Sequence, residues 1–353
     1  MLEREMVDHF RIYPDEIVFI GDDQLVYANA ETYLLRTIDD RTHQQLSEKI
    51  SMAQWLTHQG ETDIAIYMKP ADKRNTLFID GDDKVVFHIP QQQMHDGSKK
   101  MSLGKRLARF HERGYSYSPK DKKVTAFLSS WKERWEKRLD QLEHWYVKIS
   151  QNPEKTAFDE QFCLTFPYFI GISENAIQMM ADLAMNNTAN QMTPAKTICH
   201  ERFQEHSWLT LEEEMESRVK VPTDFTYDHY ARDLAEYIRT VWLEHDGNSR
   251  GEEMIDTFLN HYESEHPLML MDQQYLFARL LFPAHYYEKI EQYYQTGHQG
   301  KKALLQTDCL RLFHFSADYE RLLTFICRRY PLLITGNVIP QWIRKGDFSW
   351  QSG

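Results

Sequence analysis

The sequence contains no run of about 18 consecutive apolar residues, which is the length that a membrane-spanning helix needs. The first residues, MLEREMVDHF, also lack the basic stretch followed by an apolar stretch that marks a secretory signal. We therefore expect a soluble protein that is made in a cytoplasm and does not insert into a membrane.

Cysteine is scarce, and no two cysteines form a CxxC pair. Their neighbours in the sequence are mostly apolar. This distribution favours reduced, buried thiols over disulfides or zinc ligands. The four positions are Cys163, Cys199, Cys309 and Cys327.

Basic residues are outnumbered by acidic ones, with 41 Lys and Arg against 53 Asp and Glu, so the formal net charge is −12 at pH 7. A field of this sign repels phosphate backbones and anionic lipid surfaces. We therefore expect neither a nucleic-acid partner nor a membrane partner.

The N-terminal part of the chain has the pattern of an antiparallel sheet. Runs of β-branched and aromatic residues alternate with turn residues, and the sequence at 80–82, Asp-Gly-Asp, is a strong hairpin signal. Apolar residues recur every three or four positions between 46 and 56, which predicts one helix that ends near Gly60. The expected strands are 16–20, 24–28, 31–37, 63–68, 76–80 and 84–89.

Helical patterns dominate the rest of the chain. Apolar residues recur at helical spacing over 124–149. This pattern fits either a coiled coil or a helix packed in a bundle, and the flanking helices favour the bundle. Tyrosines near residue 290 are at helical spacing and are expected to be packing residues: Tyr286, Tyr287, Tyr293 and Tyr294. Further helices are expected at 103–110, 174–185, 229–245, 251–263, 269–281 and 316–329.

With 353 residues, of which 42% are hydrophobic, the chain can bury a large core, and its length favours two lobes. Residues 91–100 are polar and aperiodic, which indicates a hinge or linker. We predict an α+β bilobal fold: a small lobe at 1–90 with an antiparallel sheet and one helix, then a larger, mainly helical lobe at 101–353.

Several segments resemble the aminoglycoside and choline kinase family. Residues 103–111, LGKRLARFH, look like the helix that follows the hinge in that fold, and 166–178 resembles the segment before the catalytic loop. Residues 232–239, RDLAEYIR, resemble a helix of the CotS/YutH type of spore-coat-associated protein. This resemblance implies a kinase-like fold and a place in the coat of a bacterial endospore.

The catalytic loop of that family has the pattern H-x-D-x-x-x-x-N, and it is similar in spacing to the residues that begin at His200. In this alignment Arg202 occupies the position of the catalytic base and Ser207 that of the metal-binding Asn. An arginine cannot act as a general base because it stays protonated. His200 itself is either a structural histidine that braces the loop or a surface histidine.

The resemblance also places the nucleotide and metal residues. Asp224 matches the second metal-binding Asp, although one carboxylate alone is a poor ligand set for magnesium. Arg36 stands where the phosphate-contacting lysine is expected, and Glu48 is its expected partner, but the preceding turns lack a glycine-rich run. ATP and magnesium are the implied cofactors, yet these residues do not predict firm binding of either.

Other acidic residues near the loop have two interpretations each. Glu201 and Glu205 are either solvated charges or substitute bases, and the acidic run at 212–216 is expected to be a solvated turn. Asp233, at a helix start, is expected to accept hydrogen bonds from the backbone of the loop.

Two functional hypotheses follow, beside the third possibility of an unrelated α+β protein. The first is a catalytically inactive pseudokinase that acts as a scaffold in spore coat assembly, with other coat proteins as partners. It would be made in the cytoplasm of a sporulating cell and then join the coat. The second is an active ATP-dependent phosphotransferase on a small hydroxylated substrate, with Asp224 and an unconventional base such as Glu205.

Overall fold

A computed structural model describes residues 2–72, 74–90, 101–120, 131–189, 195–210, 218–314 and 316–335. The chain divides into two compact units. Unit 1 consists of residues 1–125, 195–233 and 260–266, and unit 2 consists of 126–194, 234–259 and 267–353. The linker predicted at 91–100 lies outside the described residues, so the lobe boundary drawn there stays a prediction.

The N-terminal sheet of unit 1 confirms the strands expected from the sequence. All neighbouring strands are antiparallel, in the order β1-β2-β3-β6-β4, and β5 pairs with another part of β6. The strands are β1 (Glu16–Ile20), β2 (Asp23–Ala28), β3 (Glu31–Thr37), β4 (Ile66–Met68), β5 (Leu77–Ile79) and β6 (Asp82–Ile89).

The hairpin between β5 and β6 shows why its sequence predicted a turn. Asp80 and Gly81 both have positive φ values, 55° and 94°. A two-residue hairpin turn of this kind needs left-handed backbone at both positions, which Asp and Gly adopt most readily.

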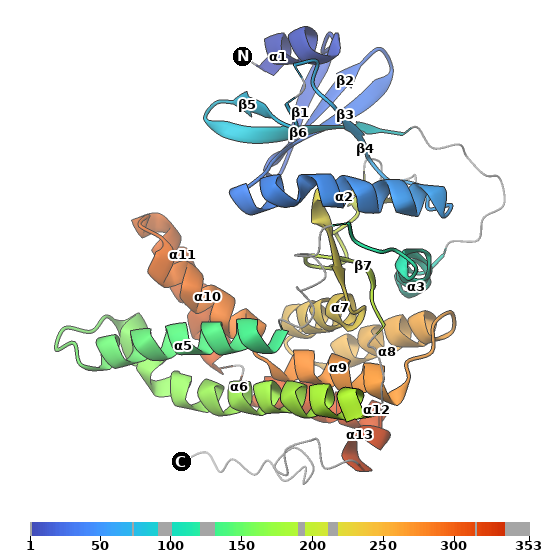
Figure 1. Ribbon diagram of the computed structural model, residues 1–353. Helices are drawn as coiled ribbons and strands as arrows, with labels where there is room; N and C mark the ends of the chain where they lie inside the picture. Colours follow the sequence, from blue (N-terminus) through green and yellow to red (C-terminus); the bar gives the residue numbers. More distant parts are fainter. Residues whose placement is uncertain are drawn as a thin grey trace. The chain divides into compact units, whose positions relative to one another are not determined.

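Two helices cover the two faces of this sheet (Figure 1). The expected helix is α2 (Asp40–His58), whose N-terminus is capped by the Asp39 carboxylate, 2.8 Å from the Thr42 N–H. The helix α1 (Leu2–Phe10) was not predicted. Its apolar residues Leu2, Met6 and Phe10 pack against the opposite face of the sheet and recur every four residues, which was the available signal.

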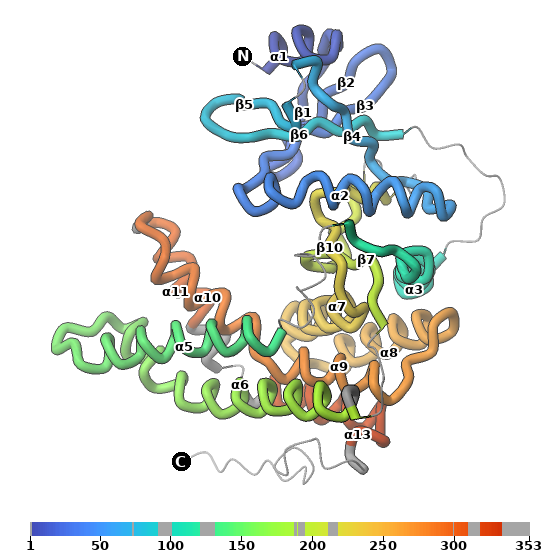
Figure 2. Tube along the Cα trace, viewed as in Figure 1, coloured from blue at the N-terminus to red at the C-terminus, as the bar shows by residue number. Residues whose placement is uncertain are grey.

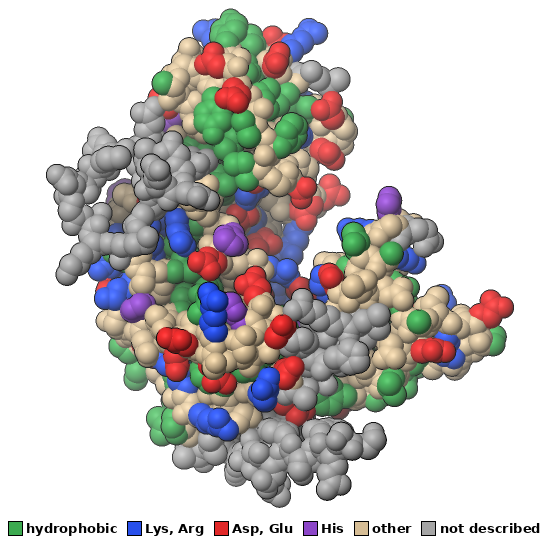
Figure 3. Space-filling model, turned by 180° about the vertical axis from the view of Figure 1, so that it is seen from behind, with side chains coloured by type: hydrophobic (Ala, Val, Ile, Leu, Met, Phe, Trp, Pro, Cys, Tyr) green, Lys and Arg blue, Asp and Glu red, His purple; other side chains and the backbone are tan. Residues whose placement is uncertain are grey.

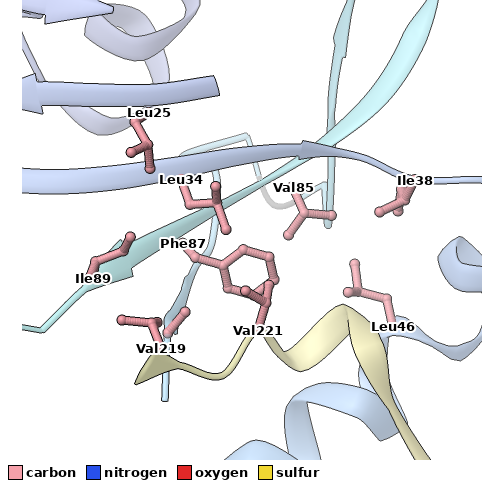
Figure 4. Packing of buried hydrophobic residues seen from close by; sticks show 10 residues of the cluster. Leu25, Leu34, Ile38, Leu46, Val85, Phe87, Ile89, Val219 and Val221 are labelled. Carbon is pink, nitrogen blue, oxygen red and sulfur yellow. The ribbon is translucent and has the colours of Figure 1, made fainter. Parts of the chain in front are cut away.

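The core between the sheet and α2 is completed by residues from much later in the chain (Figure 4). Val219 and Val221 are buried against Leu34 and Phe87 of the sheet. A backbone hydrogen bond fixes them beside the sheet, because Ala65 donates to the Lys220 carbonyl at 3.0 Å.

The remaining elements of unit 1 surround this late segment. Strand β7 pairs antiparallel with β10 (Figure 2). Strand β8 pairs antiparallel with β9. The elements are α3 (Leu103–Gly114), β7 (Thr197–His200), β8 (Leu209–Thr210), β9 (Arg218–Val219), the short 3-10 helix η1 (Pro222–Asp224) and β10 (Phe225–Asp228).

Unit 2 is helical in its described residues. The long helix α5 (Trp131–Ser150) buries Trp131, Trp135 and Leu139, so it is a bundle helix, as expected, while residues 124–130 of the predicted pattern lie outside the described residues. Helices α10, α11 and α13 were not predicted, and α6 was predicted only over 174–185. The other helices are α6 (Ala157–Ala189), α9 (Leu270–Leu281), α10 (Ala284–Gln295), α11 (Gln299–His314), α12 (Ser316–Arg329) and α13 (Leu332–Thr335), while α7 (Ala231–Glu244) and α8 (Ser249–Glu263) belong partly to each unit.

The side-chain expectations for the core hold with one exception. All four cysteines are free thiols, but Cys163 is only half-buried. Tyr286, Tyr287 and Tyr293 are buried, and the half-buried Tyr294 packs its ring against Phe158 and Phe162, so all four are packing residues. Within the described residues, no helix combines the length and the apolar character needed to cross a bilayer.

The core beneath the sheet gives a stability prediction. Phe87 is fully buried, so Phe87→Ala should lower the free energy of unfolding by about 3–5 kcal/mol through lost contacts and the cavity left behind. The matched control is Phe78→Ala, because Phe78 is 61% exposed and its loss should cost less than about 0.5 kcal/mol. Urea denaturation followed by tryptophan fluorescence measures both, and equal losses would contradict this account of the core.

Candidate functional site

The candidate site lies in unit 1, and its first part is an ion-pair group around Arg36 of β3. The Arg36 guanidinium donates to both carboxylate oxygens of Asp23, with the shortest distance 2.6 Å from Nη2 to Oδ2. Its Nη1 lies 2.7 Å from Asp224 Oδ2 and 3.2 Å from Thr223 Oγ1. Burial alone would lower the pKa of Arg36, but the charges of Asp224 and Asp23 raise it. Arg36 is therefore a permanent cation between two carboxylates.

The second part of the site is the ammonium group of Lys49 on α2, whose side chain is 1% exposed. Lys49 Nζ lies 2.7 Å from Glu201 Oε1, 2.8 Å from the Thr223 carbonyl and 2.7 Å from the Phe225 carbonyl. Burial lowers the pKa of Lys49, and the charge of Glu201 opposes that effect. Because three acceptor oxygens require all three ammonium protons, we assign Lys49 as charged.

A buried hydrogen-bond network fixes the start of the loop at His200. Asp233 Oδ2 lies 2.7 Å from His200 Nδ1 and 3.1 Å from His111 Nε2, and Asp233 also accepts from the His200 backbone N–H, as expected. Trp208 Nε1 donates to His200 Nε2 at 2.9 Å, which places the proton of His200 on Nδ1. His200 is thus a buried structural residue here, not a surface histidine.

The network shifts the pKa of Asp233 and of His111. Burial alone would raise the pKa of Asp233, but its electrostatic interactions with His200 and His111 and the hydrogen bonds from both rings lower it. Burial lowers the pKa of His111, and Asp233 opposes that effect. The network therefore holds an ionised carboxylate inside unit 1.

The loop that follows His200 is held by its own residues and by Arg232. Arg232 donates to the His200 carbonyl at 2.9 Å and the Glu201 carbonyl at 2.7 Å. Ser207 Oγ accepts from the Gln204 N–H at 2.7 Å and donates to the Arg202 carbonyl at 3.0 Å. Ser207 therefore closes a turn of the loop, while the side chain of Arg202 is exposed.

Glu48 is not the partner of Arg36, contrary to the expectation from the sequence. The Glu48 carboxylate accepts hydrogen bonds from the Tyr117 hydroxyl and from the Lys120 N–H. One residue along a helix turns the side chain by about 100°, so Lys49, not Glu48, points toward η1 and β10. Arg36 instead takes its partners from Asp23 and Asp224.

The residues with a possible role as base are arranged unfavourably for that role. Burial alone would raise the pKa of Glu201, but the charge of Lys49 and its hydrogen bond lower it, which weakens Glu201 as a base. Glu205 is exposed. The acidic run at 212–216 lies outside the described residues.

As arranged, these side chains do not fit a complex of magnesium and nucleotide. In working kinases, metal ions lie between carboxylate ligands and the nucleotide phosphates, and a basic residue on the third strand contacts those phosphates. Here Asp224 Oδ2 already accepts from Arg36 Nη1 at 2.7 Å, so a metal ion or a phosphate oxygen could bind between these two atoms only after the ion pair separates.

Another possible metal group among the described residues is His111, Cys199 and Asp233, whose ligand atoms lie within 4.8 Å of one another. Both nitrogens of this histidine are already hydrogen-bonded, to Asp233 and to Tyr262. We therefore interpret the group as structural.

Sequence reasoning missed Lys49 and Asp23, which take part in two of the three ion pairs that Arg36 and Lys49 form. Lys49 follows Leu46 by three residues and precedes Ala53 by four, so it falls on the buried stripe of its helix. A charged residue on a buried stripe was the signal that could have identified it. Asp23 lies between the expected strands 16–20 and 24–28, at a position where the sequence carries no signal of a site residue.

Comparisons with known proteins place the chain among kinase-like spore coat proteins. The family described as "Spore coat putative kinase YutH" matches residues 3–326. The chain is also 33% identical over 321 residues to the endospore coat-associated protein YutH of Bacillus subtilis (strain 168). The match covers 89% of this chain and 90% of that relative.

Solved structures support the same fold. An aminoglycoside phosphotransferase from Alicyclobacillus acidocaldarius has a TM-score of 0.61 at 12% identity and covers 90% of this chain and 92% of its own. A spectinomycin phosphotransferase, solved with ADP and spectinomycin, has a TM-score of 0.58 at 13% identity, with 92% and 96% covered. At such identities the likeness shows the fold alone, which confirms the predicted kinase-like α+β fold.

The buried ammonium gives a prediction that a surface ion pair would not. Lys49→Met should lower the free energy of unfolding by about 3–5 kcal/mol, because Glu201 and two carbonyls lose their partner in a buried place. The control is Lys132→Met, which breaks a half-exposed ion pair with Glu136 and should change little. In the double variant with Glu201→Gln, part of the loss should be recovered. Urea denaturation measures each variant, and equal effects at Lys49 and Lys132 would contradict the geometry.

The Asp233 network predicts a pH dependence. Since the folded state lowers the pKa of Asp233, its carboxylate adds stability that is fully present above its unfolded pKa and is lost as the pH falls toward the folded value. The stability difference between the wild type and Asp233→Asn should stay constant from neutral pH to about pH 5 and shrink below about pH 4. Urea denaturation at a series of pH values tests this, and a difference that grows in acid would refute it.

Proposed function

Because this chain belongs to the family of spore coat putative kinases typified by YutH, we propose that it is a spore-coat-associated pseudokinase that acts as a scaffold in coat assembly. It has kept the kinase-like fold and no longer transfers phosphate. The proposal assigns it to the cytoplasm of a sporulating cell and then to the spore coat, with other coat proteins as partners.

The observation that carries the proposal is the direct ion pair of Arg36 with Asp224 at 2.7 Å. Catalysis of phosphoryl transfer depends almost wholly on positioning and on neutralising the phosphate charges with metal ions and basic residues. Asp224 is neutralised by the Arg36 guanidinium, which is itself neutralised by two carboxylates. Neither residue is therefore placed to position a metal ion or to neutralise a phosphate charge. Nucleotide binding would first have to break this ion pair.

The packing beneath the sheet supports the same proposal. Val219 and Val221, just before Asp224 in the chain, lie in direct contact with the apolar underside of the sheet (Figure 4). A ligand base inserted there would have to displace well-packed side chains, at a cost in lost contacts.

The residues of the loop support it as well. Arg202 cannot accept a proton from a substrate hydroxyl. Ser207 is used to close the loop, and Glu201 is bonded to Lys49. The rival hypothesis of an active phosphotransferase would need Glu205, an exposed residue of the loop, as its base.

A thermal-shift titration with ATP and with ADP, each with and without magnesium, tests the proposal. A ligand at about 100 times its dissociation constant stabilises the native state by about 2.7 kcal/mol, which raises the melting temperature by a few degrees. We expect no magnesium-dependent rise and no phosphorylation of a panel of small hydroxylated compounds.

Asp224→Asn and Ser207→Ala are the informative variants if turnover is seen. Phosphorylation that disappears in Asp224→Asn and survives in Ser207→Ala would establish the active-enzyme hypothesis and reject the pseudokinase. Turnover that survives in both variants would be traced to a contaminating kinase, which a repeated purification removes.

A further inference from the structure

Strand β1 (Glu16–Ile20) is at the edge of the sheet and is unusually apolar for that position. It pairs with β2 on one side, and among the described residues no strand pairs with its other side. Three successive side chains are exposed, Val18 at 36%, Phe19 at 69% and Ile20 at 38%. Edge strands are normally protected by charge or proline, so an exposed apolar edge is a site for pairing with another strand.

The exposed strand is bordered by acidic residues at both ends. Asp15 and Glu16 precede the apolar residues, Asp22 follows them, and all three are exposed. No lysine or arginine occurs between residues 12 and 35. Figure 3 shows hydrophobic side chains gathered on the sheet-bearing part of the molecule, with acidic side chains beside them.

This charge pattern argues against a second copy of the chain as the occupant of the edge. Two β1 strands in antiparallel pairing would bring Glu16 of each toward Asp22 of the other. Parallel pairing would place Glu16 beside Glu16. Because like charges on paired strands are destabilising, both arrangements are disfavoured at each end of the strand.

We propose that the outer edge of β1 binds an extended segment of a partner protein that has apolar residues at alternate positions and lysine or arginine at both ends. Backbone hydrogen bonds with the added strand would supply affinity. Val18 and Phe19, which point to opposite faces of the sheet, would contact its side chains and favour apolar ones. The basic ends would pair with Glu16 and Asp22. The proposal stands on this strand alone and does not depend on whether the protein transfers phosphate.

The probe is a fluorescein-labelled synthetic peptide of alternating valine and threonine with lysines at both ends, titrated with the full-length protein and followed by anisotropy. The control peptides carry glutamates in place of the lysines, or a central proline that prevents strand pairing. We expect the lysine peptide to bind, the other two to bind at least about tenfold more weakly, and the affinity to fall with added salt.

Variants of the protein locate the binding. Phe19→Lys should weaken binding of the lysine peptide about tenfold or more, because it places a charge on the apolar edge and repels the basic ends of the peptide. The matched control is Phe78→Lys, which makes the same change at an equally exposed phenylalanine on β5. The double reversal of Glu16→Lys with Asp22→Lys should invert the preference, so that the glutamate peptide binds better. Thermal melts verify that each variant is folded, and the charge reversal, confined to exposed side chains, decides the question if Phe19→Lys does not fold.

Three results would overturn the proposal. The first is equal binding, or no binding, of the lysine and glutamate peptides. The second is an equal loss of binding in Phe19→Lys and Phe78→Lys. The third is self-association of the protein, measured by sedimentation and abolished by Phe19→Lys, which would assign the edge to a second copy.

Discussion

The ammonium group of Lys49 is the interaction on which the rest of unit 1 depends. Its three hydrogen bonds join α2 to the residue after β7, to Thr223 within η1 and to Phe225, the residue that follows η1. A buried ammonium is costly unless it is paired and hydrogen-bonded, and these oxygens satisfy it completely. The position of α2 under the sheet and the position of the Asp224 segment are therefore fixed by the same group.

The second cation of the site extends this arrangement to the sheet. Arg36 connects β3 to Asp224 and, through Asp23, to the neighbouring strand. The two cations, Lys49 and Arg36, thus lie among three carboxylates, and all five groups are side chains of this protein. The hydrogen-bond network of Asp233 also supports the loop, because Asp233 accepts from both the backbone N–H and the ring of His200.

Local chemistry made the sheet predictable from the sequence. The β-branched runs and the Asp-Gly turn at 80–81 depend on residues that are adjacent in the chain, so the sequence alone is enough to predict them. The helix at 2–10 is not among the predicted elements, although Leu2, Met6 and Phe10 recur at four-residue spacing. The kinase-like fold came from short motifs, chiefly the one at 232–239, since element order alone fits many α+β proteins.

The ion pairs of the site could not be predicted in the same way. Lys49 and Glu201 are 152 residues apart, and Arg36 and Asp224 are 188 apart. Which acid meets which base over such separations is decided by the packing of the whole unit. The expected pair of Arg36 with Glu48 came from the family pattern, and it failed because the helix presents the next residue, Lys49, to the site.

The origin of the core beneath the sheet has a consequence for the synthesis of the protein. The sheet and α2 leave the ribosome early, but Val219 and Val221, which complete their shared core, belong to a segment that emerges much later. Until then the underside of the sheet, including Leu34 and Phe87, has no complete cover. The nascent chain therefore carries an exposed apolar surface while about 130 further residues are made, from Ile89 to Val219, and it should require chaperone protection during that period.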